Sequence, residues 1–449
     1  MKRTHCETQR VQDGAGNEAR TRYLHLGKVA LYRMSYARIS KGYITTKNAN
    51  VKNFFLMLLN PEGKEQKKYL YGREPGGILY RYGRSPGKKV YYMKIVVLGG
   101  GISTERQVSL VSATSVCRAL RSLGHQAVFV DLYLGIEETD VPLEQLFDAP
   151  DGRCGQVGIE KTAPDLAAVR AFRKDQSDSR IGKNVLEICK LADCVFLGLH
   201  GQDGEDGKIQ ATLDLLGVPY TGSGPLGSGM AMDKAVAKRI MESCGVRTPA
   251  WQELSYTAEQ IPALEDTLPV PCAVKVVGGG SSIGVALPET REELRSALEE
   301  ILRYGNRVVV EEKIRGRELT VPVLGEKALS PIEIVPPQGK DFDYVSKYQS
   351  GDEGAREICP APISEEEHAL LTEAALRIHA ALGLSVYSRT DFILDGEGRA
   401  WCLEVNTLPG MTPASLIPKA AKLEGLSYAA LCEKIVLLSL AQRRKERAC

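Results

Sequence analysis

A hairpin near the carboxyl end of the chain decides the fold, and it reads Arg389-Thr390-Asp391-Phe392, then Asp395-Gly396-Glu397-Gly398, then Leu403-Glu404-Val405-Asn406. If the turn is symmetric, Asp391 pairs with Cys402 and Arg389 pairs with Glu404. Strand side chains alternate with a period of two, which predicts one shared face for four polar residues: Arg389, Asp391, Glu404 and Asn406. Two carboxylates, an amide and a guanidinium indicate a site for a hard cation and nucleotide phosphates, with a solvated hairpin face as the alternative.

The length and composition are typical of a soluble globular protein with about two to four domains. The chain has 449 residues, of which 43% are hydrophobic and 25% are charged. Its net charge of +2 conceals an asymmetry, because residues 1–92 hold 19 Lys and Arg against 6 Asp and Glu. The other residues carry a net charge of −11, which argues against a nucleic-acid-binding body.

The first 92 residues differ from the rest of the chain. They contain ten of the eighteen tyrosines and show no sustained helical or strand period. Because Met93 then opens an apolar strand, we interpret the extension as an upstream translated stretch or a disordered tail. The alternative is a basic arm for nucleic acid or a membrane surface.

Eleven cysteines occur without a Cys-x-x-Cys pair. Several fall inside apolar runs and are predicted to be buried free thiols in a reducing compartment: Cys117, Cys194, Cys272 and Cys402. No apolar run reaches the length of a membrane span, so we expect a cytoplasmic protein without membrane insertion.

Residues 93–223 alternate between strands and helices. A strand over 93–98 leads through three glycines into a helix over 105–123, and strands over 127–132 and 194–199 follow. Glycine-rich crossovers between such elements predict a doubly wound parallel sheet. The glycine spacing is not G-x-G-x-x-G and no acidic residue follows at the ribose position, so we exclude a dinucleotide site.

A second unit spans residues 224–310, and Ser228 is predicted to cap its first helix. The strand Cys272–Val277 runs into a loop over 278–284 with four glycines and two hydroxyls. This backbone suits close approach to a polyanion, with Lys275 as a point charge. A flexible surface turn is the alternative.

A third unit spans residues 311–442 and begins with two strands. Taken alone, the sequence predicts that Glu311 and Glu318 on these strands are exposed charges. A polar stretch over 341–357 is typical of a mobile lid above an active site.

A capping box of Ser364 and Glu367 predicts a helix that ends near Leu382, just before the hairpin. A last amphipathic helix follows the hairpin. We interpret residues 443–449 as a basic, solvated tail.

Taken in order, these motifs resemble the D-alanine–D-alanine ligases of the ATP-grasp superfamily, over Met93 to about Leu440. Four runs carry the resemblance: Ser103 to Ser109, His200 to Gly207, Met232-Asp233-Lys234, and Glu404 to Thr412. It implies an α/β fold class, with an amino-terminal doubly wound parallel-sheet domain followed by a two-lobed ATP-grasp α+β region. The chain departs from the family at Val276, where proline commonly follows the phosphate lysine, and in the charged segment 137–180, which has no assigned role.

The resemblance implies ATP-dependent ligation of two D-alanine molecules to D-alanyl-D-alanine through an acyl phosphate, for peptidoglycan precursor synthesis. It implies ATP and two Mg²⁺ or Mn²⁺ ions as cofactors, small molecules and no nucleic acid as partners, and a homodimer. Alternatives are a ligase that joins D-alanine to D-serine or D-lactate, and a non-catalytic ATP-binding module.

The resemblance also assigns roles to individual residues. Nucleotide contacts are implied for Lys234, Lys275, Ser282, Glu311, Glu318 and Lys347. Metal ligation is implied for Asp391, Glu404 and Asn406. Catalytic roles are implied for Glu105, Ser281, Tyr348, Arg389 and Gly410, the last two around an oxyanion. Substrate contacts are implied for His200, Ser415 and Leu416. A tyrosine at 348 after Lys347 favours the dipeptide over D-alanyl-D-lactate.

Overall fold

The computed structural model describes residues 92–448 apart from 156–163, 281–283 and 337–354, and before residue 92 only the backbone of strands. The chain divides into two compact units, Met1–Arg73 and Glu74–Cys449. The first unit holds antiparallel strands β1 (Ser35–Tyr36), β2 (Tyr43–Lys47), β3 (Asn53–Leu59) and β4 (Glu65–Arg73). The second opens with the antiparallel hairpin of β5 (Leu79–Ser85) and β6 (Lys88–Tyr92). The sequence of this extension did not predict these strands.

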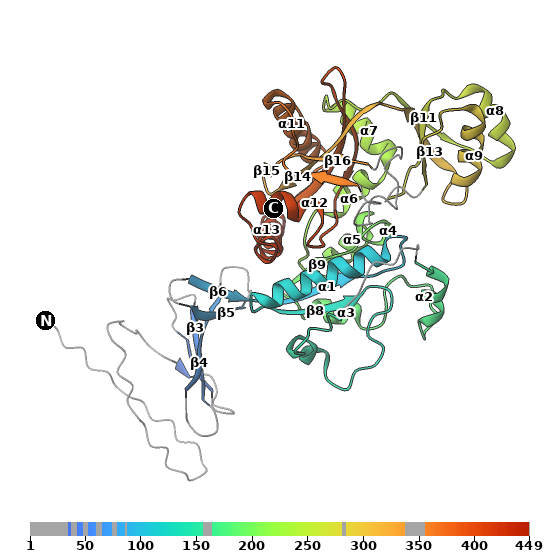
Figure 1. Ribbon diagram of the computed structural model, residues 1–449. Coiled ribbons are helices and arrows are strands. Elements are labelled where there is room, and N and C mark those ends of the chain that lie inside the picture. The colour runs from blue at the N-terminus through green and yellow to red at the C-terminus, as the bar shows by residue number, and fades with distance from the viewer. Residues whose placement is uncertain are drawn as a thin grey trace, which may run out of the picture. The chain divides into compact units, whose positions relative to one another are not determined.

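The amino-terminal domain contains a parallel sheet in the order β8-β7-β9, of which Figure 1 labels β8 and β9. Its strands are β7 (Lys94–Gly99), β8 (Gln126–Asp131) and β9 (Cys194–Leu197). Helix α1 (Arg106–Ser122) packs on β7 and β8. The predicted doubly wound parallel arrangement is therefore confirmed.

Glycines after the strands let α1 lie close to this sheet. A Cβ atom on Gly99 would lie 2.4 Å from the Cβ atom of Ala113, and one on Gly198 would lie 2.9 Å from it. No side chain fits into either space, so these two positions favour glycine for helix packing.

The rest of this domain consists of short helices: η1 (Leu143–Asp148), α2 (Leu166–Phe172), α3 (Val185–Lys190), α4 (Gln202–Glu205) and α5 (Lys208–Leu215). The first two lie in the charged segment that the sequence left without a role.

The central lobe is an antiparallel sheet in the order β10-β13-β11-β12. Its strands are β10 (Trp251–Ser255), β11 (Cys272–Val276), β12 (Val285–Ala286) and β13 (Arg307–Glu312). The turn η2 (Ala258–Gln260) leads into α8 (Ile261–Thr267), which packs with α9 (Arg291–Ile301). Because β13 runs to Glu312, the expected boundary between residues 310 and 311 falls inside a strand.

Two helices, rather than one, precede this lobe: α6 (Pro225–Met232) and α7 (Lys234–Ser243). The predicted cap at Ser228 is wrong, because Asp233 has an extended backbone and caps α7 by accepting from the N–H of Val236 at 2.9 Å. Such a cap is worth about 1 kcal/mol. Both helices contact the carboxy-terminal lobe, including its strand β19.

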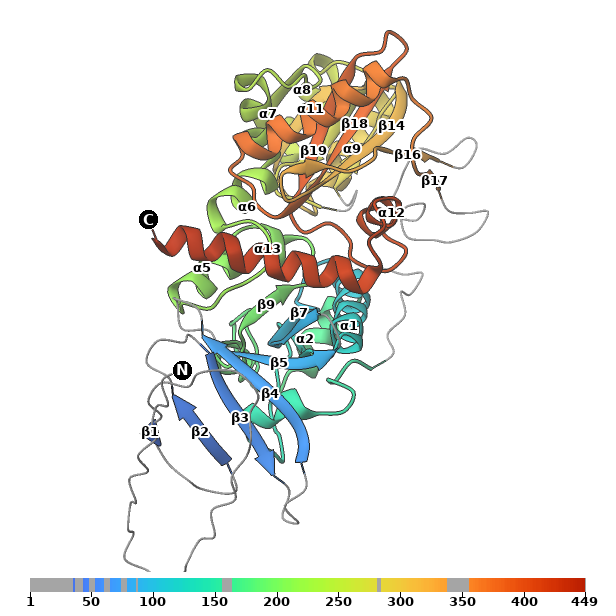
Figure 2. The same ribbon diagram turned by 90° about the vertical axis from the view of Figure 1, so that its left-hand side faces the viewer.

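The carboxy-terminal lobe is an antiparallel sheet in the order β17-β16-β14-β18-β19, with β15 beside β14. The strands are β14 (Gly316–Leu324), β15 (Lys327–Ala328), β16 (Ile332–Val335), β17 (Arg356–Ile358), β18 (Tyr387–Asp395) and β19 (Ala400–Asn406). Helix α11 (Glu365–Ala381) packs along β14, β18 and β19 (Figure 2). The predicted capping box of Ser364 and Glu367 is confirmed.

The chain ends in α12 (Leu416–Leu423) and α13 (Tyr428–Ala448), and α13 packs on α1 and β9 (Figure 2). The prediction of a solvated tail is wrong for Arg443, which is 5% exposed. Its guanidinium lies 3.9 Å from the ring centroid of Tyr220 and donates to the carbonyl of Gly222 at 2.7 Å. In the described part of the chain, no helix combines the length and apolarity that crossing a membrane requires.

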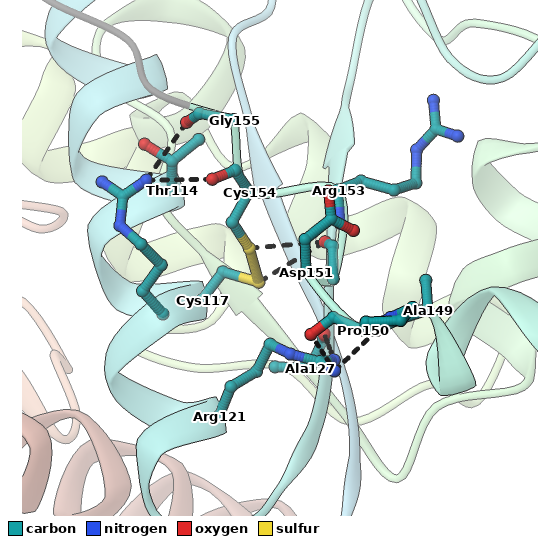
Figure 3. The surroundings of a disulfide bond; sticks show 12 residues. Thr114, Cys117, Arg121, Ala127, Ala149, Pro150, Asp151, Arg153, Cys154 and Gly155 are labelled. Atoms are coloured by element: carbon teal, nitrogen blue, oxygen red, sulfur yellow. Dashed lines mark hydrogen bonds between the residues drawn. A yellow bond between two sulfur atoms is a disulfide. The ribbon is translucent and has the colours of Figure 1, made fainter.

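A disulfide joins Cys117 of α1 to Cys154, with their Cα atoms 6.5 Å apart (Figure 3). The prediction of a free thiol at Cys117 is therefore wrong, because the sequence does not reveal that this loop returns to the helix. The thiols of Cys194, Cys272 and Cys402 are free and buried, as predicted.

Candidate active site

The β18–β19 hairpin pairs in a different register from the symmetric one. Asp391 lies opposite Glu404, and Arg389 lies opposite Asn406. The predicted pairings of Asp391 with Cys402 and of Arg389 with Glu404 are therefore wrong, by two residues in each case.

Two single-residue changes produce this shift. The turn is one residue longer than a symmetric turn, because the Asp395 carboxylate accepts from the backbone N–H of Arg399 at 2.9 Å. A β-bulge between Asp391 and Phe392 adds the second change. Together they move the register by an even number, so the predicted polar residues still share a face.

The Asp391 carboxylate accepts hydrogen bonds from three neighbouring side chains. The guanidinium of Arg389 donates to both carboxylate oxygens, at 2.8 and 2.7 Å. The hydroxyl of Thr320 on β14 donates at 2.6 Å, and the amide of Asn406 donates at 3.1 Å. Sequence reasoning missed Thr320, whose place opposite Asp391 follows only from the pairing of β14 with β18.

Lys234 connects the polar face to the glycine-rich loop. It is buried at the start of α7, and its Nζ lies 3.5 Å from Oε2 of Glu404. It also donates to the carbonyl of Gly279 at 2.5 Å. The fold thus brings Lys234 to both motifs, across 170 residues of sequence in the case of Glu404 and 45 in the case of Gly279.

Glu311 lies between two lysines. Its side chain is 2% exposed and forms ion pairs with Lys275 and with Lys238, so the prediction of an exposed charge is wrong. Burial lowers the pKa of Lys275, but Glu311, helped by Glu404 and Glu318, outweighs burial and raises the pKa overall. These acids therefore gather around Lys275, and Glu318 is half-buried.

Glu105 stands between two glycines from different domains. A Cβ atom on Gly280 of the glycine-rich loop would lie 2.8 Å from its Oε2, and one on Gly201 would lie 2.9 Å from it. The structure thus places the Glu105 side chain of the amino-terminal domain directly against the glycine-rich loop that is predicted to bind a polyanion.

His200 is buried and held at both ring nitrogens. Its Nδ1 lies 2.8 Å from the carbonyl of Leu408, so Nδ1 carries the proton. Its Nε2 lies 3.0 Å from the hydroxyl of Ser112, which also accepts from the N–H of Met411 at 3.4 Å. Burial lowers the pKa of His200, which agrees with a neutral ring.

Glu205 is a connection that sequence reasoning missed. One carboxylate oxygen accepts from the N–H groups of Thr407 and Leu408, at 3.0 and 3.1 Å, and the other accepts from Gly201 at 3.2 Å. It thereby fastens the loop after β19 to the loop after β9. The sequence signal that could have identified Glu205 is its position inside the run from His200 to Gly207.

Gly410, Ser415 and Leu416 lie together at the start of α12. A Cβ atom on Gly410 would lie 3.0 Å from the Ser415 hydroxyl, which also accepts from the N–H of Thr412 at 3.0 Å. Leu416 is the first residue of α12, so its backbone N–H is one of the donors at a helix start that have no acceptor within the helix.

Four predicted site residues lie outside the described residues and stay predictions: Ser281, Ser282, Lys347 and Tyr348.

The donor set on β18 and β19 fits a hard divalent cation. Asp391, Glu404 and Asn406 offer carboxylate and amide oxygens on neighbouring strands, and such oxygens suit Mg²⁺. Among the residues that the structure describes, no three His, Cys, Asp or Glu side chains form a metal-binding group. A cation here would therefore depend on the Asn406 amide beside the two carboxylates.

Glu205 gives a pH-dependent prediction. Burial, and next the charge of Glu105, raise its pKa from 4.5 to about 7. The native state then binds this proton more tightly than the unfolded chain, so its stabilising effect is full below about pH 4.5 and is lost as the pH rises through about 7. Relative to Glu205→Gln, the wild-type free energy of unfolding should fall by up to about 3 kcal/mol across that range.

Denaturant unfolding at pH 5 and pH 8 checks this, with Glu187→Gln, an exposed glutamate on α3, as the control. Parallel pH profiles for wild type and Glu205→Gln would contradict the prediction.

Two family models match the chain. "D-ala D-ala ligase N-terminus" covers residues 94–223, and "D-ala D-ala ligase C-terminus" covers residues 240–437. Both matches lie after the basic extension.

Curated relatives are similar along nearly their whole length. The D-alanine–D-alanine ligase of Lacticaseibacillus casei is 40% identical over 344 residues, covering 77% of this chain and 95% of the relative. That of Halalkalibacterium halodurans is 41% identical over 353 residues, covering 78% and 99%.

Solved structures show the same likeness. The D-alanine–D-alanine ligase of Bacillus anthracis complexed with ATP has a TM-score of 0.58 and 30% identity, covering 79% of this chain and 99% of that one. The VanG D-Ala:D-Ser ligase of Enterococcus faecalis has a TM-score of 0.58 and 28% identity, covering 78% and 99%.

Proposed function

Because the chain belongs to the D-alanine–D-alanine ligase family, we propose that the residues described above carry out the ATP-dependent joining of two D-alanine molecules. The reaction yields D-alanyl-D-alanine through an acyl phosphate. The observation that carries the assignment of residues is the convergence of Asp391, Glu404 and Lys234 with the glycine-rich loop.

The chemistry explains why charged groups must converge. A carboxylate is a poor electrophile, because its charge repels an amine and its oxygen leaves badly. Phosphorylation of the first D-alanine supplies a leaving group, and the amine of the second D-alanine then attacks the acyl carbon. The site must therefore stabilise charge first on the phosphates and then on the tetrahedral oxyanion.

Lys234 and Lys275 hold the nucleotide phosphates in this proposal. Both are buried: Lys234 donates to the carbonyl of Gly279 in the glycine-rich loop, and Lys275 is part of strand β11, which leads into that loop. A buried ammonium interacts with a phosphate more strongly than an exposed one. We assign contacts with adenosine to Glu311 and to Glu318, which is half-buried on β14.

Asp391, Glu404 and Asn406 hold Mg²⁺ or Mn²⁺. When bound, such ions neutralise phosphate charge and orient the transferred group. Arg389 meanwhile orients the Asp391 carboxylate through its two hydrogen bonds.

The remaining residues position the amino acids. Glu105 pairs with the ammonium of the first D-alanine, and His200 lies near its carboxyl group. Ser415 and the N–H of Leu416 bind the second carboxylate at the start of α12. Arg389 and the N–H of Gly410 stabilise the oxyanion. Family membership further supports a homodimer that works in the cytoplasm.

Phosphate release from ATP, with D-alanine as the only amino acid, tests the proposal. Production of D-alanyl-D-alanine supports it, whereas no phosphate release would favour a non-catalytic module. D-serine and D-lactate as second substrates, compared at two pH values, separate the related ligases, because an amine must lose its proton before attack and a hydroxyl competes better when amines stay charged.

A chain that begins at Met93 should keep full activity. The family models start after the extension, and every described residue of the proposed site lies beyond Met93. Steady-state kinetics of the shortened and complete chains check this. A loss of more than about threefold in kcat, equal to roughly 0.7 kcal/mol, would assign the extension a function.

A further inference from the structure

Lys238 is a buried cation with no role so far. It lies on α7, is 1% exposed, and ranks among the largest fully buried side chains. Its Nζ lies 2.5 Å from Oε2 of Glu311, as an ion pair without the alignment of a hydrogen bond. It also donates to the hydroxyl of Thr248 at 2.7 Å.

Glu311 is thereby shared between two lysines, with Oε2 facing Lys238 and Oε1 facing Lys275. Burial raises the pKa of Glu311, but Lys275 and Lys238 outweigh burial and lower the pKa overall, so the carboxylate is ionised. Burial lowers the pKa of Lys238, and Glu311 opposes that shift. Lys238 and Lys275 thus place two positive charges beside the one carboxylate of Glu311.

The position of the charged group formed by Lys238, Glu311 and Lys275 matters, because helix α7 presents two lysines on one face. Lys234 and Lys238 are four residues apart, so they lie one above the other on the helix. Lys234 reaches Glu404, while Lys238 reaches β13 through Glu311. The hydroxyl of Thr248 in turn donates to the carbonyl of Cys402 on β19 at 2.9 Å. The group therefore lies where the two lobes meet.

We propose that Lys238 is a positioning residue for nucleotide binding: it neutralises Glu311 so that the charge of Lys275 remains available to the phosphates. Without Lys238, the charge of Lys275 is offset by Glu311, and Glu404 and Glu318 also act on it, so less positive charge remains to attract an anion. This inference rests on the proposed function, because it gives Lys275 the phosphates as its ligand.

Lys238→Met should raise the KM for ATP and the Kd for ADP about tenfold, while kcat and the KM for D-alanine change by less than threefold. Adenosine, which has no phosphate, should bind with unchanged affinity. Isothermal titration with ADP and with adenosine, together with steady-state kinetics, gives these values. Arg239→Met is the matched control, because it removes a neighbouring positive charge from the exposed side of the same helix.

A double-mutant cycle separates charge from packing. Lys238→Met should weaken ADP binding about tenfold in the wild-type background, but less than twofold when Glu311→Gln is already present, because no carboxylate then remains to be neutralised. Equal losses in both backgrounds would overturn the proposal and make Lys238 a structural residue. An unchanged Kd for ADP in Lys238→Met would also overturn it.

If Lys238→Met does not fold, two other variants decide. Lys238→Arg keeps the charge and should bind ADP within threefold of wild type. The double variant Lys238→Met/Glu311→Gln should bind ADP as Glu311→Gln alone does, and a tenfold weaker affinity in either variant would overturn the proposal. If the wild type itself fails to join D-alanine, the proposed function is wrong. If the wild type ligates normally and the Lys238 variants bind ADP as the wild type does, only the inference about Lys238 is wrong.

Discussion

Glu404→Gln is expected to lower kcat at least about a thousandfold while the fold stays intact, equal to about 4 kcal/mol of transition-state stabilisation. Glu404 lies opposite Asp391 in the β18–β19 pairing and is 3.5 Å from the ammonium of Lys234. Glutamine keeps the shape but loses the charge. Of the two carboxylates proposed to bind divalent ions, Asp391 alone then remains. Divalent ions are needed to neutralise the charge of the phosphates.

Phosphate release at saturating ATP and D-alanine, over a titration of MgCl₂, measures this effect. Glu397→Gln is the matched control, because Glu397 lies in the turn of the same hairpin and its side chain is 71% exposed. The control should keep wild-type kcat. Normal activity of Glu404→Gln at every magnesium concentration would remove Glu404 from the proposed metal ligands.

The sequence pattern of the β18–β19 hairpin predicted the shared face of its polar side chains but not their pairing. Alternation of side chains gave the correct shared face for Asp391 and Glu404, because that property depends only on whether the shift is odd or even. It gave the wrong partners, because the Asp395 side chain accepts from the backbone N–H of Arg399 in a longer turn and a bulge lies between Asp391 and Phe392. Neither the longer turn nor the bulge produces a repeating pattern of residue types, so periodicity in the sequence does not predict them.

The local sequence also did not predict which charged side chains are buried. Glu311 and Glu318 lie on two strands that follow one another in sequence but belong to different sheets, and Glu311 is enclosed by Lys238 and Lys275 whereas Glu318 is half-buried. The lysines that enclose Glu311 come from α7 and β11. A prediction of burial therefore required knowledge of which elements pack together, and the strand sequence alone does not contain it.

Long-range connections were missed for the same reason. Glu205 reaches the loop after β19 across about 200 residues, and Cys154 returns to α1 across 37. The capping box at Ser364, by contrast, was correct because all of its hydrogen bonds join residues within one helical turn.

Arg389→Lys is expected to lower kcat about a hundred- to a thousandfold, which is typical of losing a donor to a tetrahedral oxyanion. The guanidinium donates to both oxygens of Asp391, at 2.8 and 2.7 Å. The guanidinium is therefore held in a fixed orientation, and in this proposal its planar charge lies beside the developing oxyanion. Lysine keeps the positive charge but cannot donate in two fixed directions, so it loses the orientation set by Asp391 and with it the contact to the oxyanion in the transition state.

Because that interaction is absent in the ground state, kcat and kcat/KM for D-alanine should fall by the same factor. Arg399→Lys is the matched control: Arg399 lies on the same hairpin and its Nε donates to Asp395 at 2.7 Å, at the end away from the polar face. Its kinetics should equal those of the wild type. A rise in KM for D-alanine with unchanged kcat would show that Arg389 binds substrate and leaves the oxyanion to other groups.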